Sequence, residues 1–480
     1  MKKLTYILIL FILFGCSSQP KKEQSSKYIE PNIIIFLIDD LGKEWVGCYG
    51  ADSLITPNID KLADSGILFN NYYAMPQCTP TRVSLLTGQY PFRHGWVNHW
   101  DVPRWGGGAH FDETLNPSVG IEMKKAGYKT CIAGKWQIDD FRLEPDALIN
   151  NGFDDFCMWT GYEAGIPASG KRYQNPYIFT TGGSRTYDNE FGPDIFKEFI
   201  IDFIHLNKES PMFIYYPMVL AHPPLVNTPD EEPDTPVGKH MAMVKYTDKI
   251  TGEIIKALED ANIRDNTVII WTTDNGTSKG LTGSINGNRI KGGKSETSEN
   301  GICVPFIVSW PEKIKPGQTS NALIDITDFY PTFLDLANMT KTTDQVQDGF
   351  SFKDVLTGVS VKSSREWILG MGGKNNARLT DKGVENQYVF RDRVLRNERY
   401  KLYVGTNKKP QKFFDLQTDP YEKNNLINKL ETEEQKQNFQ KLSAVIQSFP
   451  DIDNDPRYHP NLQQEWDVKV TAKSEVWKKK

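Results

Sequence analysis

Short apolar runs alternate with amphipathic stretches along most of the chain, and four of the runs end abruptly in polar residues. Such runs are typical of parallel strands buried in a sheet that helices cover on both faces. Because ligands bind outside the carboxyl ends of such strands, we expect the polar residues that follow them to converge. The runs cover 32–38, 128–133, 212–220 and 267–273, and they lead into Asp39-Asp40, Gly134-Lys135-Trp136, Ala221-His222-Pro223 and Asp274-Asn275-Gly276.

Helical spacing of apolar residues is found between these runs. After Gly358 the pattern changes to short strand-like runs, typical of an antiparallel sheet. Thr432 and Gln435 have the spacing of a capping box at the start of a closing helix over 432–449. Helices are expected over 59–65, 120–126, 193–206 and 241–260, and C-terminal strands over 366–371, 388–395, 400–404 and 413–416.

These patterns predict an α/β fold with a large central, mostly parallel sheet flanked by helices. A smaller C-terminal α+β subdomain built on an antiparallel sheet is expected to follow it. We place the boundary near Gly358, which gives a catalytic domain over 31–358 and a subdomain over 359–480.

The amino terminus has the pattern of a signal peptide over 1–15, with two lysines before a short apolar run. Gly15 and Cys16 resemble the lipobox of bacterial lipoproteins, which implies cleavage before Cys16 and attachment of lipid, including palmitate, to it. The polar residues 16–30 then form a tether. The prediction is a cell-envelope lipoprotein that faces the periplasm or the cell surface. Phe14 is unusual in a lipobox, so a secreted protein without lipid on Cys16 is the alternative.

Composition narrows the class of protein. The chain has 480 residues, of which 39% are hydrophobic, and this content excludes disorder or a coiled coil as the main architecture. The formal charge is −5 and no long basic run occurs, so we expect no nucleic acid partner. The 6 cysteines include no Cys-x-x-Cys pair that would indicate zinc or redox chemistry.

One cysteine lies in a chemically suggestive segment, Cys78-Thr79-Pro80-Thr81-Arg82, which leads into Thr87-Gly88. Pro80 suits the first turn of a helix, so Cys78 is expected at the helix entrance, where free amide groups favour an anion. Arg82 lies one turn further along the same face. Taken alone, the segment also fits an ordinary buried cysteine at the start of a helix.

The whole string resembles the signature of the type I sulfatases of the alkaline phosphatase superfamily. In that family the cysteine is oxidised to formylglycine (3-oxoalanine) by a maturation enzyme. The resemblance covers nearly the whole chain, from Asp39-Asp40 to Arg399-Tyr400-Lys401-Leu402 and Asp419-Pro420. It implies a sulfatase, a sulfuric ester hydrolase, that acts on a sulfated carbohydrate, such as polysaccharide-derived oligosaccharides.

The resemblance also implies a metal site. Asp39, Asp40, Asp274 and Asn275 would bind one divalent cation together with an oxygen of the modified Cys78. Carboxylate and amide oxygens select a hard cation, and we favour Ca²⁺ over Mg²⁺.

Four cationic or titratable residues, namely Arg82, Lys135, His222 and Lys294, would surround the sulfate oxygens by the same resemblance. The hydrated aldehyde at residue 78 would attack sulfur, and His222 or Lys294 would protonate the leaving sugar alcohol. A base would then take a proton from the second hydroxyl of residue 78, which expels sulfate and restores the aldehyde.

Two positions depart from the family pattern. Gln137 stands where Gly-Lys-Trp-His has its histidine, and glutamine cannot act as a base at neutral pH. Either His94 or His99 replaces that base, or the sulfated intermediate breaks down slowly. Cys303 stands where the family has arginine in Gly-Ile-Arg-Val-Pro, a change expected to affect packing or the pocket rim.

The segment after the signature is rich in glycine, histidine and tryptophan, and His94, His99 and Trp105 belong to it. Flat rings and cations suit a sugar cleft, to which Gln137 would also contribute, but a hydrophobic loop packed on the second domain explains the composition equally well. Two rival functions remain open. One is a phosphonate monoester or phosphodiester hydrolase of the same superfamily, and the other is a catalytically weak lipoprotein that binds sulfated glycans.

Overall fold

The computed structural model describes residues 30–52, 56–98, 110–161, 163, 166–372, 390–459, 461–462 and 464–466, together with the backbone of 377–380 and 383–386. A large mixed sheet forms its centre, and β9, β1, β8, β4 and β5 are parallel neighbours within it. Across the sheet the order is β13-β2-β12-β9-β1-β8-β4-β5-β6-β7. The strands are β1 (Asn32–Ile38), β2 (Ile67–Phe69), β4 (Lys129–Lys135), β5 (Asp155–Trp159), β6 (Tyr177–Thr180), β7 (Gly183–Thr186), β8 (Met212–Pro217), β9 (Thr267–Thr273), β12 (Phe306–Ser309) and β13 (Gln318–Ser320).

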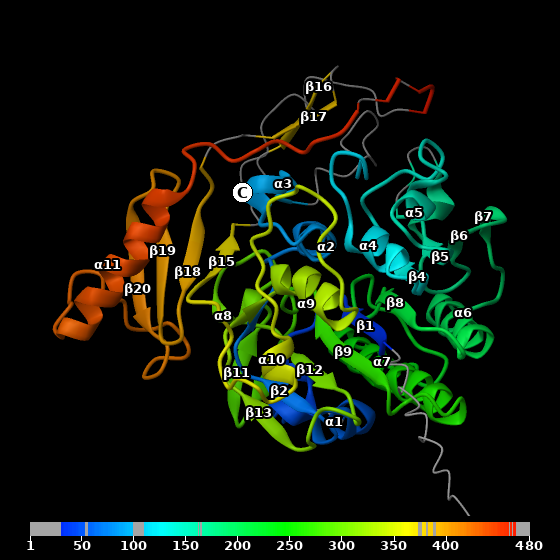
Figure 1. The fold of residues 1–480 in the computed structure, drawn as a ribbon, viewed down its shortest axis with the longest axis horizontal. Coiled ribbons are helices and arrows are strands. Elements are labelled where there is room, and N and C mark those ends of the chain that lie inside the picture. The colour runs from blue at the N-terminus through cyan, green and yellow to red at the C-terminus, as the bar shows by residue number, and fades with distance from the viewer. Residues whose placement is uncertain are drawn as a thin grey trace, which may run out of the picture.

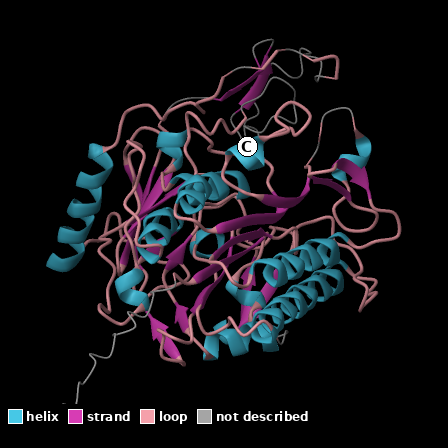
Figure 2. Cartoon of the chain, turned by 45° about the vertical axis from the view of Figure 1, so that its right-hand side comes forward, coloured by secondary structure: helices cyan, strands magenta, loops and turns pink. Residues whose placement is uncertain are grey.

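Helices cover both faces of this sheet (Figure 2). Successive side chains of a strand point to opposite faces, so Ile33 and Ile35 of β1 join one core while Ile34 and Phe36 join the other. The first core includes side chains of α2 (Cys78–Thr87), α4 (Val119–Lys125) and α9 (Phe329–Leu336), and the second those of α1 (Pro57–Asp64), α6 (Gly192–Asn207) and α7 (Pro236–Asp260). Shorter elements are β3 (Tyr72–Tyr73), α3 (Pro91–His94), α5 (Ala147–Asn150), β10 (Thr282–Ile285), β11 (Asn288–Lys291), α8 (Glu299–Ile302), β14 (Ile324–Asp325) and α10 (Lys353–Leu356).

A separate antiparallel sheet with the order β15-β18-β19-β20 lies beside the large unit, and helix α11 packs on it (Figure 1). Its elements are β15 (Ile368–Met371), β18 (Arg393–Arg396), β19 (Tyr400–Val404), β20 (Pro410–Asp415) and α11 (Glu433–Ser448), and the backbone of β16 (Ala377–Thr380) and β17 (Gly383–Asn386) forms a hairpin. The expected capping box is confirmed, because Thr432 Oγ1 accepts from Gln435 N at 3.2 Å.

The segment after α11 returns to the large unit, where Asn454 N donates to the carbonyl oxygen of Phe92 at 2.9 Å (Figure 1). The fold class is thus the one expected, and the bounds of several strands differ from the expectation. Strand β4 extends to Lys135, whereas β8 ends at Pro217, earlier than the apolar run does. The domain division at 358 stays a prediction.

Neither a disulfide nor a membrane span is found in the described part of the chain. Cys48, Cys78, Cys131, Cys157 and Cys303 are all free thiols. Among the helices of that part, none combines the length and the apolar character that crossing a bilayer requires.

Candidate functional site

The carboxyl ends of four neighbouring parallel strands meet at one edge of the central sheet. Across the sheet these strands follow the order β9, β1, β8 and β4. Asp39 and Asp40 follow β1, Asp274 and Asn275 follow β9, and Lys135 is the last residue of β4. The expected convergence is therefore confirmed, because the sheet order makes segments neighbours that are far apart in the sequence.

Two glycines permit the close approach of these segments. Gly134 has a φ of 114°, and a Cβ atom there would collide with the carbonyl oxygen of Pro217. A Cβ atom on Gly276 would collide with the carbonyl oxygen of Asn300. Glycine is thus required where β4 passes β8 and where the chain leaves β9.

Asp39 and Asp274 are fully buried, and two cationic side chains hold them. Lys135 Nζ lies 2.6 Å from Asp39 Oδ2, and Arg82 Nη2 lies 2.9 Å from Asp274 Oδ2. Arg82 Nη1 also donates to the carbonyl oxygen of Lys135 at 2.7 Å. These contacts link helix α2 to the ends of β1, β4 and β9.

Asp40 is surrounded by polar side chains from three other segments. It accepts hydrogen bonds from Asn275 Nδ2 at 2.8 Å and from Ser278 Oγ at 2.7 Å. Lys294 Nζ lies 2.6 Å from its Oδ1, and His222 Nε2 lies 3.7 Å from its Oδ2. Asp40 thus brings His222 and Lys294 to the same site as the β9 residues.

Cys78 is the first residue of α2, and it is 3% exposed. Its Sγ lies 3.4 Å from Gln137 Oε1, so the structure places Gln137 beside the signature cysteine, as the sequence suggested. The residue before it, Gln77, donates from Nε2 to Ser295 Oγ at 3.0 Å. This bond connects the start of α2 to the segment that carries Lys294.

Three residues of this site have left-handed backbone conformations that residues other than glycine rarely adopt. Asp40, Gln137 and Ser295 have φ values of 63°, 66° and 68°. Strained backbone of this kind clusters at functional sites, where the surrounding contacts over-determine it.

The pKa values of the buried carboxylates at this site shift in opposite directions, downward for Asp39 and Asp40 and upward for Asp274. Burial raises the pKa of Asp39, but the surrounding cationic groups, Lys135 foremost, together outweigh burial and hold that pKa well below its usual range. For Asp40, burial likewise raises the pKa, and the surrounding cationic groups, Lys294 foremost, together lower it below its ordinary value. Burial and the neighbouring Asp39 charge raise the pKa of Asp274 to about 7. Burial lowers the pKa of His222 to about 3, so its imidazole is neutral here.

The carboxylate and amide oxygens at this site fit a hard divalent cation. Ligand atoms of Asp39, Asp40 and His222 lie within 4.8 Å of one another. Asp39 Oδ1 and Asn275 Oδ1 are buried without a hydrogen-bond partner in the described part of the chain. Buried oxygens are otherwise nearly always paired, so these two are available as ligands.

Supporting residues were missed by the sequence reasoning. Ser278 bonds Asp40, and Thr277 Oγ1 donates to Glu44 Oε1 at 2.6 Å and accepts from Gly42 N at 2.8 Å. The only available signal was the pair of hydroxyl residues directly after the Asp274 segment. Such a pair is too common to indicate a role by itself.

Of the residues expected to contact substrate, the structure excludes one from the cysteine site. His94 is fully buried, with its Nε2 3.1 Å from Ser84 Oγ and its Nδ1 accepting from Trp96 N at 3.1 Å. Both ring nitrogens are thus engaged inside the core, so the prediction of His94 as a base or sugar contact was wrong. His99 and Trp105 lie outside the described residues.

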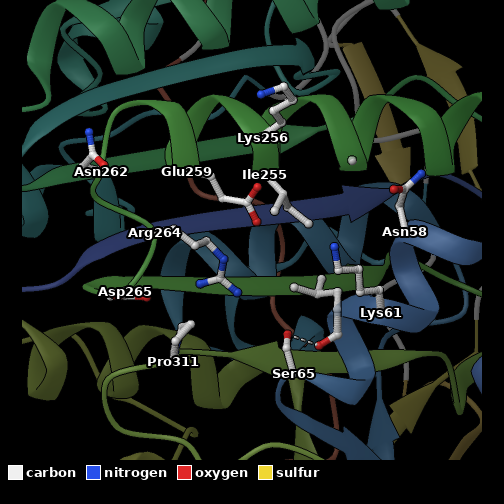
Figure 3. Close-up of a pocket in the computed structure, with 12 residues that line it drawn as sticks. Asn58, Lys61, Ser65, Ile255, Lys256, Glu259, Asn262, Arg264, Asp265 and Pro311 are labelled. Atoms are coloured by element: carbon white, nitrogen blue, oxygen red, sulfur yellow. Dashed lines mark hydrogen bonds between the residues drawn. The ribbon is translucent and has the colours of Figure 1, made fainter.

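A cleft of 620 Å³ between α1 and α7 is separate from this site (Figure 3). Lys61, Glu259 and Arg264 line it. Arg264 and Asp265 precede β9, so the cleft lies at the amino end of that strand, opposite to Asp274.

Two family models match the chain. The model described as Sulfatase matches residues 31–339, and the model described as N-sulphoglucosamine sulphohydrolase, C-terminal, matches residues 294–448. The first model covers more than half of the chain and includes Cys78 and all four expected metal ligands.

Curated relatives extend over most of the chain. An N-acetylgalactosamine-6-O-sulfatase of Bacteroides thetaiotaomicron is 28% identical, and the match covers 86% of this chain and 93% of the relative. Human N-acetylgalactosamine-6-sulfatase is 31% identical over 68% of this chain and 66% of its own length. An ulvan-active sulfatase of Formosa agariphila is 28% identical over 87% of this chain and 82% of its own length.

Solved structures share the fold. The structure of Ps i-CgsB superposes with a TM-score of 0.72 at 24% identity, covering 89% of this chain and 94% of the other. A protein solved with its substrate, D-glucosamine-2-N,6-O-disulfate, superposes with a TM-score of 0.66 at 20% identity, covering 87% of this chain and 97% of the other. The fold that the resemblance implied is confirmed by these likenesses.

Proposed function

Because the chain belongs to the sulfatase family, and is therefore a sulfuric ester hydrolase, we propose that it removes sulfate from polysaccharide-derived oligosaccharides through a formylglycine at residue 78. The observation that carries this proposal is that Arg82, one helical turn after Cys78, contacts residues at the ends of β1, β4 and β9. A nucleophile at a helix entrance thus lies on the same helix as a cation that contacts the candidate metal ligands.

The signature string from Cys78 to Arg82 supports conversion of Cys78 to formylglycine by a maturation enzyme. The hydrate of that aldehyde carries two hydroxyl groups, one to attack sulfur and one to lose a proton when the sulfated residue breaks down. A plain serine ester would lack the second hydroxyl and would need water to attack at sulfur. The free amide groups at the start of α2 favour negative charge beside residue 78.

We assign Asp39, Asp40, Asp274 and Asn275, together with an oxygen of the modified residue 78, to one divalent cation, with Ca²⁺ favoured over Mg²⁺. When bound, the cation would favour ionisation of a hydroxyl on residue 78 and offset charge on the sulfate. The unpaired oxygens of Asp39 and Asn275 support this assignment. The near-neutral pKa of Asp274 supports it too, because a cation would stabilise the ionised carboxylate.

Arg82, Lys135, His222 and Lys294 form the proposed sulfate site. Arg82 and Lys135 are committed to carboxylates, so their charge is fixed before substrate binds. Asp40 raises the pKa of Lys294 above its ordinary value despite burial, so Lys294 carries a proton. His222 Nδ1 lies 2.5 Å from the carbonyl oxygen of Pro223, which leaves Nε2 of the neutral ring without a proton. These protonation states favour Lys294 over His222 as donor to the leaving alcohol.

The substrate class rests on the relatives. The two relatives from bacteria are named for N-acetylgalactosamine-6-O-sulfate and for ulvan, and a structural neighbour was solved with a disulfated glucosamine. A sulfated carbohydrate is the shared chemistry of these proteins. We therefore propose such a carbohydrate as the substrate here.

The enzyme is expected to hydrolyse an aryl sulfate faster than the matching aryl phosphodiester. Both rates are measured with Ca²⁺, on protein in which mass spectrometry has confirmed 3-oxoalanine at residue 78. Cys78→Ala is expected to lower the sulfatase kcat by more than about 10⁴-fold, because it removes the nucleophile. Faster diester turnover would favour the phosphodiesterase alternative. Sulfated-glycan binding without sulfate release by the modified protein would favour the glycan-binding alternative.

Calcium is expected to raise the melting temperature of protein freed of metal by chelation, because only the folded chain assembles the ligands. At a concentration of a hundred times Kd the gain is about 2.7 kcal/mol. Asp40→Asn should abolish most of the shift, while the exposed carboxylate variant Asp260→Asn should retain it. A shift that survives in Asp40→Asn, or a larger shift with Mg²⁺, would contradict the assignment.

Gln137→His is expected to raise kcat by about 100-fold if breakdown of the sulfated residue limits turnover, since it supplies a base beside residue 78. The parent should then release one equivalent of alcohol in a burst and accumulate sulfated enzyme. Gln137→Leu is the control, because it adds no base. The absence of both burst and acceleration would indicate that another residue already acts as the base.

Lipidation of Cys16 is proposed as the means of anchoring in the cell envelope, facing the periplasm or the cell surface. Cys16→Ala is expected to shift the protein from the membrane fraction to the soluble fraction and to abolish labelling by palmitate. Cys48→Ala, a change at a half-buried thiol of the folded body, should alter neither. A Cys16→Ala protein that stays in the membrane fraction would reject the anchor.

A further inference from the structure

A cleft of 790 Å³ lies between the segment that follows β1 and the C-terminal sheet. Gly42, Lys43 and Glu44 form one wall, and residues of β11, α8 and the C-terminal sheet form the others. None of the residues assigned above to the cation or the sulfate lines it. The cleft is therefore distinct from the Cys78 site.

The cleft is basic although the chain is acidic overall. Its described lining residues include six basic side chains and three acidic ones, while the whole chain has a net charge of −5. Two of the acidic groups, Glu299 and Glu422, are paired with Lys401 at 2.9 and 3.1 Å. Burial raises the pKa of the third, Glu44, to about 7. The exposed basic groups thus determine the field in the cleft.

A buried guanidinium with spare donors lies in the wall. Arg396 is 5% exposed, and its Nη2 donates to Asn71 Oδ1 at 3.0 Å. Its Nε and Nη1 have no hydrogen-bond partner among the residues that the structure describes. Both of these atoms are themselves buried, so Arg396 adds positive charge to the wall of the cleft without exposing these N–H groups to it.

Lysines and tyrosine rings form the outer part of the cleft. Lys412 Nζ lies 5.5 Å from the centre of the Tyr403 ring, and Lys423 Nζ lies 5.3 Å from the centre of the Tyr421 ring. Arg289 and Lys291 extend the basic surface along β11. Flat rings beside cations suit a sugar ring that carries an acidic group.

Cys303 also lines the cleft, at the position where the family string Gly-Ile-Arg-Val-Pro has arginine. Lys43 Nζ lies 3.1 Å from its Sγ and donates to the carbonyl oxygen of Asn70 at 2.8 Å. A cysteine occupies less space than an arginine, so this departure leaves room in the cleft. The pocket rim that Cys303 was expected to affect is therefore the rim of this cleft.

We propose that this cleft binds a second acidic sugar of the substrate polymer, through its sulfate or carboxylate, while another sulfate occupies the Cys78 site. The proposal rests on the glycan sulfatase function proposed above. The two sites share a segment, because Glu44 of the cleft accepts from Thr277 while the adjacent Ser278 bonds Asp40. A polyanionic chain is therefore the class of substrate that would occupy both the cleft and the Cys78 site.

The test compares Lys412→Gln/Lys423→Gln with Lys436→Gln/Lys441→Gln, which removes the same charge from the exposed face of α11. The cleft variant should raise KM for a sulfated polysaccharide about tenfold and leave kcat/KM for a small aryl sulfate unchanged. The control variant should change neither value. Arg396→Gln, checked for an unchanged melting temperature, should act in the same direction as the cleft variant.

Two further measurements separate the possible failures. If the parent enzyme hydrolyses no aryl sulfate, the proposed function is rejected. The cleft can still be tested in that case, by measuring binding of the polysaccharide to the Cys78→Ala protein. Equal polymer KM values in the cleft and control variants would overturn the cleft proposal. The cleft proposal would also be overturned if the cleft variant lost binding of inorganic sulfate but kept its binding of the polysaccharide. The cleft would then hold only a free anion.

Discussion

The site depends on one buried arrangement of opposite charges at the carboxyl edge of the sheet. Asp39, Asp40 and Asp274 face Arg82, Lys135 and Lys294. A buried charge left without its partner destabilises a protein by about 3–5 kcal/mol, so each of these side chains requires the others. The parallel order β9, β1, β8, β4 provides the required proximity, and Arg82 extends it to the helix that begins at Cys78.

Much of this arrangement could be predicted because it depends on local chemistry. Apolar runs indicated the parallel strands, and the abrupt polar ends of those runs indicated Asp39, Lys135 and Asp274. The signature predicted the helix at Cys78 and the position of Arg82. The structure brings these residues together, as ligand sites in α/β sheets require. The capping box of α11 was equally visible, because its two hydrogen bonds join residues only three apart.

Features that depend on tertiary packing could not be predicted. The composition around His94 suited a sugar cleft, but only the fold shows that Ser84 and Trp96 engage both ring nitrogens within the core. The same holds for Ser278, whose bond to Asp40 spans 238 residues of sequence. Arg396 is another case, because only the fold shows that its Nε and Nη1 have no hydrogen-bond partner among the described residues. Sequence patterns indicate the face on which a residue lies but not the partners it finds there.

The charge balance also indicates which substrate the site suits. Three carboxylates and three cationic side chains leave the buried cluster formally neutral while His222 stays uncharged. A divalent cation on the unpaired oxygens would then give an excess of two positive charges. A sulfate ester carries one negative charge, and the second positive charge is available for the alkoxide that develops as the S–O bond breaks. A phosphodiester carries the same single charge, which explains why charge alone cannot separate these two substrates. Their discrimination must therefore come from the groups that contact the leaving alcohol and the sugar.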